Sequence, residues 1–453
     1  FRSYIKSFVD VRDERMRAVR DEALHSGLFW PEPLLQLNPN FAPGGSVPDL
    51  VREGLLHHEC ERIFQVGKSE AAQIGKPLRL YKHQVDAVRA AKAGRNYVLT
   101  TGTGSGKSLA YILPIVDRVL RQPGKRRIRA IVVYPMNALA NSQLGELRKF
   151  LEPGFPAGRP PVTFARFTGQ ESDDERDRIR QSPPDILLTN YVMLELLLTR
   201  PHDKDVLRGA EGLEFLVFDE LHTYRGRQGA DVSLLIRRTR DRLSAPKVQC
   251  IGTSATLAGP GTLAAQQAEV ARVASTIFGA EFAPSDIITE TLERVTSAEP
   301  IAPEVLKARI EGQRPTFASY DSFVRDPLAA WLEGEIGIVV DRETNRLVRA
   351  LPRPVRGDNG IAARLSADST ASEPACEEAV RALLLASYAE RLRHPQTYRP
   401  PFAFRLHQFL SPGWQMHASP ELQDVRHVTI NAQKFVPGSD RQKVLLPVVF
   451  CVE

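Results

Sequence analysis

The sequence predicts an α/β fold in which helices cover both faces of a parallel β-sheet. Short apolar runs alternate with helix-like segments between residues 77 and 259, which is the pattern of successive βαβ units. A glycine-rich turn follows one of these runs, and a pair of carboxylates follows another. Both features therefore fall at strand ends, and ligands of parallel sheets bind beyond the carboxyl ends of the strands.

Hydrophobic periodicity places the elements of this sheet domain. We expect strands at 97–100, 129–134, 162–167, 185–189, 213–218 and 248–253. We expect helices between them, for example at 82–92, 107–120, 138–150, 171–180, 191–198 and 229–243. The alternation implies a sheet that is buried on both faces.

The flanking segments are less regular. Residues 1–27 have apolar side chains at helical spacing, and residues 28–50 are rich in Pro, Asn and Gly, which favours a loop. A helix is expected at 261–278, followed by mixed structure, helical stretches within 326–395 and short strands near the end. We therefore expect an N-terminal helical extension (1–75), the parallel-sheet domain (76–260), a helical connector (261–310) and a mixed α+β accessory domain (311–453).

Composition limits the class of protein. The chain has 453 residues, enough for two or three domains, and a formal net charge of +6, which is compatible with a nucleic-acid partner. Its four cysteines are far apart and favour a reducing, cytoplasmic compartment without disulfides. No apolar run is long enough to span a membrane. The chain begins with Phe1 and ends abruptly, so we expect it to be a piece of a longer polypeptide.

The glycine-rich turn has the composition of a phosphate-binding loop. It lies between an apolar run and a helix-like segment, and its residues are Thr101, Gly102, Thr103, Gly104, Ser105, Gly106, Lys107 and Ser108. Glycines let backbone N–H groups turn toward phosphate oxygens, and the following helix adds its positive N-terminal end. Lys107 is expected at the β- and γ-phosphates and Ser108 at Mg²⁺, although the usual pattern has glycine in place of Thr101.

The acidic pair is the second candidate catalytic feature. Asp219 and Glu220 follow the apolar run 213–218. By itself such a pair is typical of a solvated strand end. Its position about 110 residues after a phosphate-binding loop instead favours nucleotide hydrolysis, in which Asp219 binds Mg²⁺ and Glu220 orients and deprotonates the attacking water.

These motifs, taken in order, resemble the first motor domain of a superfamily 2 DEAD/DEAH-box helicase. The matching strings are 81–84 for the glutamine motif, 101–108 for motif I, 134–140 for motif Ia, 219–222 for motif II in a DELH spelling, and 254–256 for motif III. The resemblance implies a RecA-like parallel sheet of the P-loop NTPase class with an N-terminal helical extension and a mixed α+β insertion after motif III. It also implies ATP and Mg²⁺ as cofactors and nucleic-acid-stimulated ATP hydrolysis.

The resemblance assigns further roles residue by residue. Tyr81 and Gln84 would bind the nucleotide, with Gln84 at the adenine edge. His222, Ser254 and Thr256 would couple nucleotide state to strand movement. Contacts to the nucleic-acid backbone, which carry little sequence preference, are expected from Pro135, Asn137, Gln143, Thr168, Gly169, Thr189 and Asn190.

A longer string around motif II refines the resemblance. Residues 219–231 are similar to those of YprA/MrfA-like bacterial helicases and of large helicases from phage-defence systems such as DISARM and Druantia. This similarity implies a DNA translocase or helicase of a bacterial defence or repair system, with defence-system subunits as possible partners and no membrane partner. An RNA helicase remains an alternative.

Motifs IV, V and VI of the family are not found in the sequence. In the family they belong to the second motor domain, which supplies an arginine finger. We therefore expect this chain alone to hydrolyse ATP poorly, by a factor of about 10³ or more. The same motifs are compatible with two other functions. The protein could be a nucleic-acid clamp that closes on ATP binding without unwinding, or a scaffold for a defence complex.

Other charged or polar groups have simpler interpretations. Arginine and lysine clusters at 118–129 and 237–242, and the mixed-charge run 171–180, are typical of solvated helix faces or loops. His57 and His58 beside Cys60 have no second ligand pair at zinc spacing, so a surface cluster is the simpler interpretation.

Overall fold

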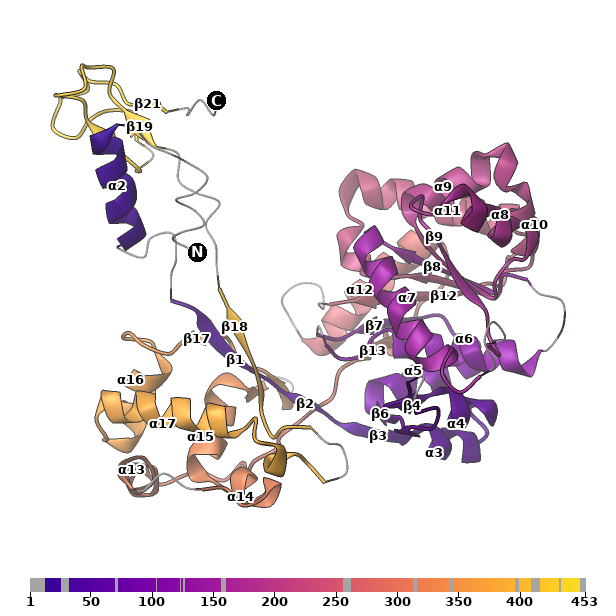
Figure 1. The fold of residues 1–453 in the computed structure, drawn as a ribbon, viewed down its shortest axis with the longest axis horizontal. Helices are drawn as coiled ribbons and strands as arrows, with labels where there is room; N and C mark the ends of the chain where they lie inside the picture. Colours follow the sequence, from indigo (N-terminus) through magenta and orange to yellow (C-terminus); the bar gives the residue numbers. More distant parts are fainter. Residues whose placement is uncertain are drawn as a thin grey trace. The chain divides into compact units, whose positions relative to one another are not determined.

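The computed structural model describes residues 13–25, 32–69, 72–102, 104–122, 124, 127–155, 160–255, 262–312, 316–341, 345–395, 399–408, 416–431 and 433–448. The chain divides into two compact units (Figure 1). The sheet unit contains residues 40–293 and 340–347, and the helical unit contains residues 1–39, 294–339 and 348–453. Each unit has a hydrophobic core of its own.

The sheet unit is built on seven parallel strands, and the predicted RecA-like α/β fold class is confirmed. The strand order is β13-β7-β12-β11-β8-β10-β9, and every neighbouring pair is parallel. Six strands lie within two residues of their predicted positions: β7 (Tyr97–Thr100), β8 (Ala130–Tyr134), β9 (Phe164–Phe167), β10 (Ile186–Asn190), β11 (Phe215–Phe218) and β12 (Gln249–Ser254). The seventh, β13 (Ile287–Thr289), was not predicted because three residues are too few to show a period.

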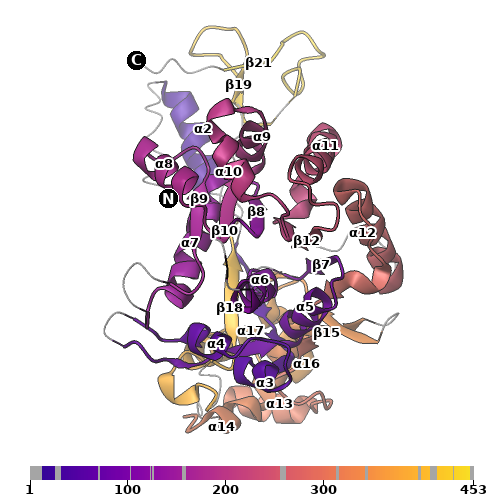
Figure 2. The same cartoon turned by 90° about the vertical axis from the view of Figure 1, so that its right-hand side faces the viewer.

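Helices cover both faces of this sheet (Figures 1 and 2). Alternate strand residues divide between the two cores, so that Tyr97 and Leu99 pack on one face and Val98 on the other. The first face is covered by α5 (Lys82–Lys92), α6 (Leu109–Arg121) and α7 (Asn137–Leu151). The second is covered by α8 (Asp173–Gln181), α9 (Tyr191–Thr199), α10 (Lys204–Gly209), α11 (Gly226–Arg242) and α12 (Leu263–Phe278), and Figure 2 shows α11 beside α12.

Residues 34–52 differ from the expected loop. They form β1 (Leu34–Asn38), β2 (Asn40–Phe41), β3 (Pro43–Ser46) and α3 (Val47–Arg52). Leu35 and Leu37 alternate with less buried neighbours and belong to the core of the helical unit, but five residues between Pro, Asn and Gly conceal this alternation in the sequence. In the sheet unit, β3 pairs antiparallel with β6 (Arg79–Tyr81), directly before α5.

The helical unit packs four helices against a small antiparallel sheet of order β17-β1-β18. The helices are α13 (Pro303–Glu311), α15 (Pro327–Ile336), α16 (Ile361–Ser369) and α17 (Glu373–Ala386), and the further strands are β17 (Arg353–Pro354) and β18 (Ala403–His407). Smaller elements of the chain are α2 (Glu14–His25), α4 (Glu59–Ile63), α14 (Tyr320–Val324), β4 (Gln65–Val66), β5 (Lys76–Pro77), β19 (His417–Ala418), β20 (Val428–Thr429) and β21 (Leu446–Pro447). None of the described helices combines the length and the apolar character needed to cross a bilayer.

Candidate active site

The predicted phosphate-binding loop connects β7 to α6 and has the backbone shape that phosphate binding needs. Gly104 and Gly106 have φ angles of +83° and +70°, a region that residues with a Cβ rarely adopt. A Cβ on Gly106 would also come within 2.6 Å of Nε2 of Gln84. The positive φ therefore favours glycine at Gly106, a Cβ there would also displace the Gln84 amide, and the loop can turn its N–H groups inward as an anion cradle.

The first part of the loop is tied to the neighbouring strand. The N–H of Thr101 donates to the carbonyl oxygen of Ser254 at 3.2 Å. The buried hydroxyl of Thr101 lies 2.6 Å from that of Ser105. This hydroxyl contact closes the loop and gives threonine a structural role where the usual pattern has glycine. Thr103 lies outside the described residues.

The lysine of the loop and the acidic pair share one site. Nζ of Lys107 lies 3.0 Å from Oε1 of Glu220, and both side chains are largely buried. The contact forms because β7 and β11 are separated only by β12 in a parallel sheet, so their carboxyl ends meet at one edge. Residues 113 positions apart are thereby brought into a single charged cluster.

Asp219 is the buried carboxylate of this cluster. Only 8% of its surface is exposed, and it accepts a hydrogen bond from the hydroxyl of Thr253. Burial raises the pKa of Asp219 above its usual value, and the negative charge of Glu220 adds to this effect. A cation beside Asp219 would offset the unfavourable burial of its negative charge, so this carboxylate fits Mg²⁺. Asp219 and Ser108 are the residues that would hold the ion, together with phosphate oxygens of the nucleotide.

Glu220 has an uncommon backbone conformation. Its φ is +53°, in the left-handed region that residues other than glycine rarely adopt. The hydroxyl of Thr253 stabilises this conformation by accepting the Glu220 N–H at 3.1 Å. Oε2 of Glu220 lies 3.2 Å from Nδ1 of His222, and that nitrogen is 3.3 Å from the hydroxyl of Ser254. His222 thus connects Glu220 of motif II with Ser254 of motif III, and its coupling role stays a prediction. Thr256 lies outside the described residues.

The glutamine motif braces the phosphate-binding loop. The side chain of Gln84 is buried, accepts the N–H of Tyr81 at 2.9 Å, and donates to the carbonyl oxygen of Gly106 at 2.9 Å. His83, which the sequence did not single out, contacts the carbonyl oxygen of Ser105 at 3.0 Å. Burial lowers the pKa of His83, which favours the neutral ring. The adenine contact assigned to Gln84 stays a prediction, because its amide is bonded to backbone here.

Most of the predicted nucleic-acid contacts line one cavity of about 580 Å³. Loops at the ends of β8, β9 and β10 surround it, and Arg176, Tyr191 and Arg200 extend it. The backbone contacts predicted from sequence that line it are Pro135, Asn137, Thr168, Gly169 and Asn190. We call this cavity the strand-tip groove.

Two predicted contacts do not line the strand-tip groove. Thr189 is fully buried, and its hydroxyl donates to the carbonyl oxygen of Phe167 at 2.7 Å. The Thr189 side chain therefore lies beneath the groove, and its contact with nucleic acid stays a prediction. Gln143 lies on the second turn of α7 and is not among the lining residues.

Glu171 corrects the expectation of a solvated face at 171–180. The side chain is 7% exposed and accepts the N–H groups of Thr168 and Gly169, both at 2.8 Å, and the Arg166 guanidinium at 2.7 Å. Burial alone would raise the pKa of Glu171, but the Thr168 N–H and the guanidinium outweigh it and hold the pKa below its usual value. Glu171 thus fixes the wall of the strand-tip groove.

Comparison with known proteins identifies the domain. The family model described as DEAD/DEAH box helicase matches residues 81–263. This chain contains a DEAD/DEAH box helicase domain. The match begins at the glutamine motif and ends after motif III, so it contains the loop, the acidic pair and the strand-tip groove.

Curated relatives extend this finding. The Druantia protein DruE of Escherichia coli is 26% identical over 369 residues, which cover 56% of this chain and 20% of that protein. The ATP-dependent helicase YprA of Bacillus subtilis is 34% identical over 189 residues, which cover 41% of this chain and 24% of that protein. The solved structure of the DUF1998 helicase MrfA bound to DNA and AMPPNP is 25% identical, covers 59% of this chain and 33% of its own, and has a TM-score of 0.43. The chain thus spans about a fifth to a quarter of the length of these curated relatives.

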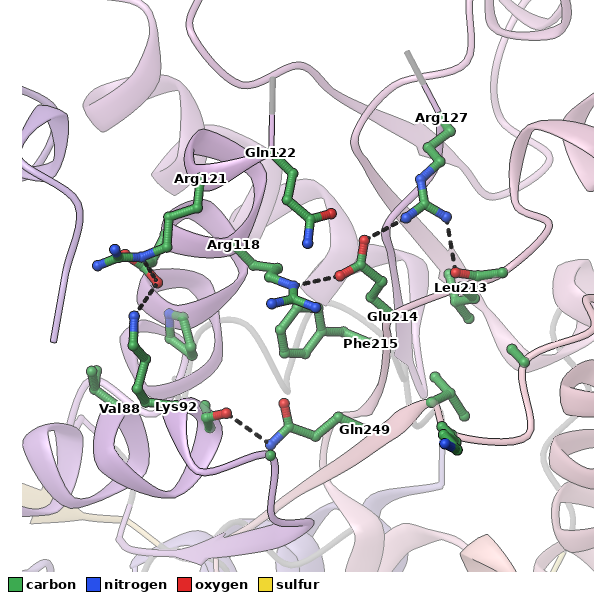
Figure 3. Close-up of a pocket in the computed structure, with 18 of the residues that line it drawn as sticks. Val88, Lys92, Arg118, Arg121, Gln122, Arg127, Leu213, Glu214, Phe215 and Gln249 are labelled. Atoms are coloured by element: carbon green, nitrogen blue, oxygen red, sulfur yellow. Dashed lines mark hydrogen bonds and ion pairs between the residues drawn. The ribbon is translucent and has the colours of Figure 1, made fainter. Parts of the chain in front are cut away.

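A second cavity, of about 570 Å³, lies at the amino ends of the strands of the helicase domain (Figure 3). Glu214 lies at its wall and binds three arginines, with distances of 2.5 Å to Arg118, 2.6 Å to Arg127 and 2.8 Å to Arg129. The basic cluster at 118–129 is therefore partly an ion-pair network and not simply a solvated face. The nucleotide and groove residues lie at the opposite, carboxyl ends of the strands, so this cavity does not belong to the candidate active site.

Proposed function

We propose that this chain is the first motor of an ATP-dependent DNA translocase or helicase. The observation that carries the proposal is the 3.0 Å contact between Lys107 and Glu220, with Asp219 buried beside it. A structural glycine turn has no need of a lysine and two carboxylates from another strand. We assign the motor function to residues 76–260, within the sheet unit, and an accessory function to residues 311–453.

The arrangement supports a division of labour among the site residues. Lys107 would leave Glu220 for the β- and γ-phosphate oxygens, which have the higher charge density. Glu220 would then have a carboxylate oxygen available to orient a water molecule and accept its proton. ATP supplies the phosphoanhydride bond whose cleavage makes the cycle irreversible. His222 would transmit the change at Glu220 to Ser254 on the next strand.

The strand-tip groove supports nucleic acid as the second substrate. Its polar groups come from three adjacent loops, and Arg176 and Arg200 add positive charge. Polar and positively charged side chains of this kind contact phosphate and sugar, which supports nucleic-acid binding with little sequence preference. The string 219–231, which resembles DNA helicases of the YprA/MrfA and phage-defence type, favours DNA over RNA and a place in a bacterial defence or repair system.

The substitution Glu220→Gln in the full-length protein tests this function. It keeps the shape of the side chain but removes the proton acceptor, so DNA-stimulated ATP hydrolysis should fall about 10²- to 10⁴-fold while nucleotide binding remains. The exposed residue Glu211 offers the matched control, because Glu211→Gln makes the same change on the surface. Retained hydrolysis in Glu220→Gln would remove the assigned role. A strand-displacement assay then separates a helicase from a clamp, since a clamp binds DNA without separating duplex strands.

A further inference from the structure

We propose that Glu290 is a positioning residue that couples the phosphate-binding loop to the chain connections between the two units. The proposal rests on the nucleotide site proposed above. Glu290 matches none of the helicase motifs in the sequence, and it follows the edge strand β13. Its side chain and its backbone each make a contact that bears on this role.

The carboxylate of Glu290 contacts the phosphate-binding loop directly. The register of the parallel pair β13–β7 aligns Thr289 with Thr100, so the residues after each strand lie side by side. Oε2 of Glu290 accepts the N–H of Gly102 at 2.8 Å. The Gly102 N–H therefore donates to a negatively charged side chain, in a loop whose N–H groups are expected to bind the phosphates of a nucleotide.

The backbone around Glu290 belongs to the connections between the units. The chain passes from one unit to the other after residues 39, 293, 339 and 347, and the first two of these points concern Glu290 most directly. The segments beside these two points pair with each other as β2 and β14 (Leu292–Glu293), and the N–H of Ala42 donates to the carbonyl oxygen of Thr291 at 2.8 Å. We call residues 40–42 and 290–293 the hinge ribbon.

The hinge ribbon also contacts the glutamine motif and Arg346. The ring of Phe41 lies 4.8 Å from that of Tyr81 and 5.4 Å from that of His83, measured between ring centroids. The other two crossings fall within β15 (Ile338–Asp341) and β16 (Arg346–Arg349), which pair as a two-stranded sheet, and Nη2 of Arg346 donates to the carbonyl oxygen of Glu290 at 3.4 Å. Glu290 thus contacts the phosphate-binding loop and Arg346 of β16 directly, and the hinge ribbon to which it belongs contacts the glutamine motif.

This arrangement makes the Glu290–Gly102 contact sensitive to nucleotide. A triphosphate in the loop repels a carboxylate held at the same loop, because like charges in a partly buried site are poorly screened. Nucleotide binding should therefore weaken the contact and loosen the hinge ribbon. The coupling is reciprocal. If nucleotide weakens the binding of a partner to the ordered hinge ribbon by some factor, that partner weakens nucleotide binding by the same factor.

Nucleotide titration of the 453-residue chain tests the charge effect. The probe is a fluorescent, non-hydrolysable ATP analogue with Mg²⁺. Glu290→Gln keeps an acceptor for the Gly102 N–H but removes the charge, so we expect binding about three- to tenfold tighter than in the wild type. Glu293→Gln makes the same change at an exposed position of the hinge ribbon and should leave the affinity unchanged. Equal or weaker binding in Glu290→Gln overturns the proposal.

Amide hydrogen exchange gives a readout that a purely structural residue would not change. In the wild type the nucleotide analogue should increase exchange in the hinge ribbon, and in Glu290→Gln this increase should be lost. Exchange that is the same with and without nucleotide in the wild type contradicts the coupling. If the wild type binds no nucleotide, the proposed function fails as well. If it binds, and Lys107→Ala abolishes binding while Glu290→Gln has no effect, only the role of Glu290 is overturned.

Discussion

Two buried carboxylates of the helicase domain have opposite electrostatic surroundings. Glu171 accepts hydrogen bonds from two backbone N–H groups and a guanidinium, and its pKa is lowered. Asp219 is equally buried, but the hydroxyl of Thr253 and the nearby Lys107 do not compensate its burial, and its pKa is raised. A buried carboxylate at a strand end with a raised pKa is more typical of a functional site than of a structural one.

Asp219→Asn should stabilise the nucleotide-free chain at neutral pH. Because the folded state raises the pKa of Asp219, ionising this group costs stability as the pH rises above its usual value near 3.8. The variant avoids this cost and can still accept the Thr253 hydroxyl. Urea unfolding without Mg²⁺ should give a larger free energy for the variant at pH 7.5, with a difference that shrinks toward pH 4. A less stable variant at pH 7.5 would contradict the assignment.

Glu171→Ala should destabilise the chain by about 3 kcal/mol, because it leaves buried donors without their acceptor. The pH dependence of this contribution to folding stability has the opposite sign from that of Asp219. The lowered pKa of Glu171 contributes stability that is present above its usual value of 4.5 and is lost as the pH falls below it. Glu175 is exposed in the capping box of the following helix, α8, so Glu175→Ala should cost only about 1 kcal/mol. Chemical denaturation at pH 7 and pH 4 measures both effects, and equal costs for the two variants would contradict the role assigned to the buried Glu171 carboxylate.

At the scale of elements, the strand-tip groove depends on one side chain that joins three loops. Oδ1 of Asn190 accepts the N–H of Met193 at 2.7 Å and so caps α9. Nδ2 of Asn190 donates to Oδ1 of Asn137 at the start of α7, at 2.6 Å, and to the carbonyl oxygen of Thr168 at 3.2 Å. The amide therefore fixes the helix starts around the groove relative to one another.

Substitutions at Asn190 should separate its two functions. Asn190→Asp keeps the cap but loses both donated bonds, so we expect weaker binding of single-stranded DNA, about five- to tenfold, from roughly 1 kcal/mol of lost organisation. Asn190→Ala also loses the cap and should cost about a further 1 kcal/mol of folding stability. Fluorescence anisotropy and thermal unfolding measure the two quantities. Unchanged DNA affinity in Asn190→Asp would show that the groove does not need this junction.

At the scale of the whole molecule, the chain has two units with separate cores. The cores on both faces of the parallel sheet lie within residues 40–293, whereas the third core lies in the helical unit. Trp331 packs against the core of the helical unit, whereas Trp30 and Trp414 lie outside the described residues. The fluorescence of Trp331 therefore reports on the helical unit, and calorimetry reports on both units.

A bound nucleotide should stabilise the sheet unit more than the helical unit. At 100 times its dissociation constant, a ligand of the folded state adds about 2.7 kcal/mol, which raises the melting temperature of a unit of this size by roughly 5–10 °C. We expect this shift in calorimetry with a non-hydrolysable ATP analogue and Mg²⁺, and a smaller shift in the transition followed by tryptophan. Lys107→Ala should abolish the shift. Equal shifts by both methods would mean that the two units unfold together.

The sequence by itself determined the features whose signal is local. Six strands, the helices between them, the glycine loop and the acidic pair all depend on short-range periodicity or on residues within one turn, and the order of these motifs predicted the helicase domain. The tertiary structure alone decided which distant groups meet. Glu290 reaches Gly102 across 188 positions through a three-residue edge strand, and Glu171 turns inward from a run of charges that looks solvated. Such contacts follow from strand register and burial, and neither leaves a periodic trace in the sequence.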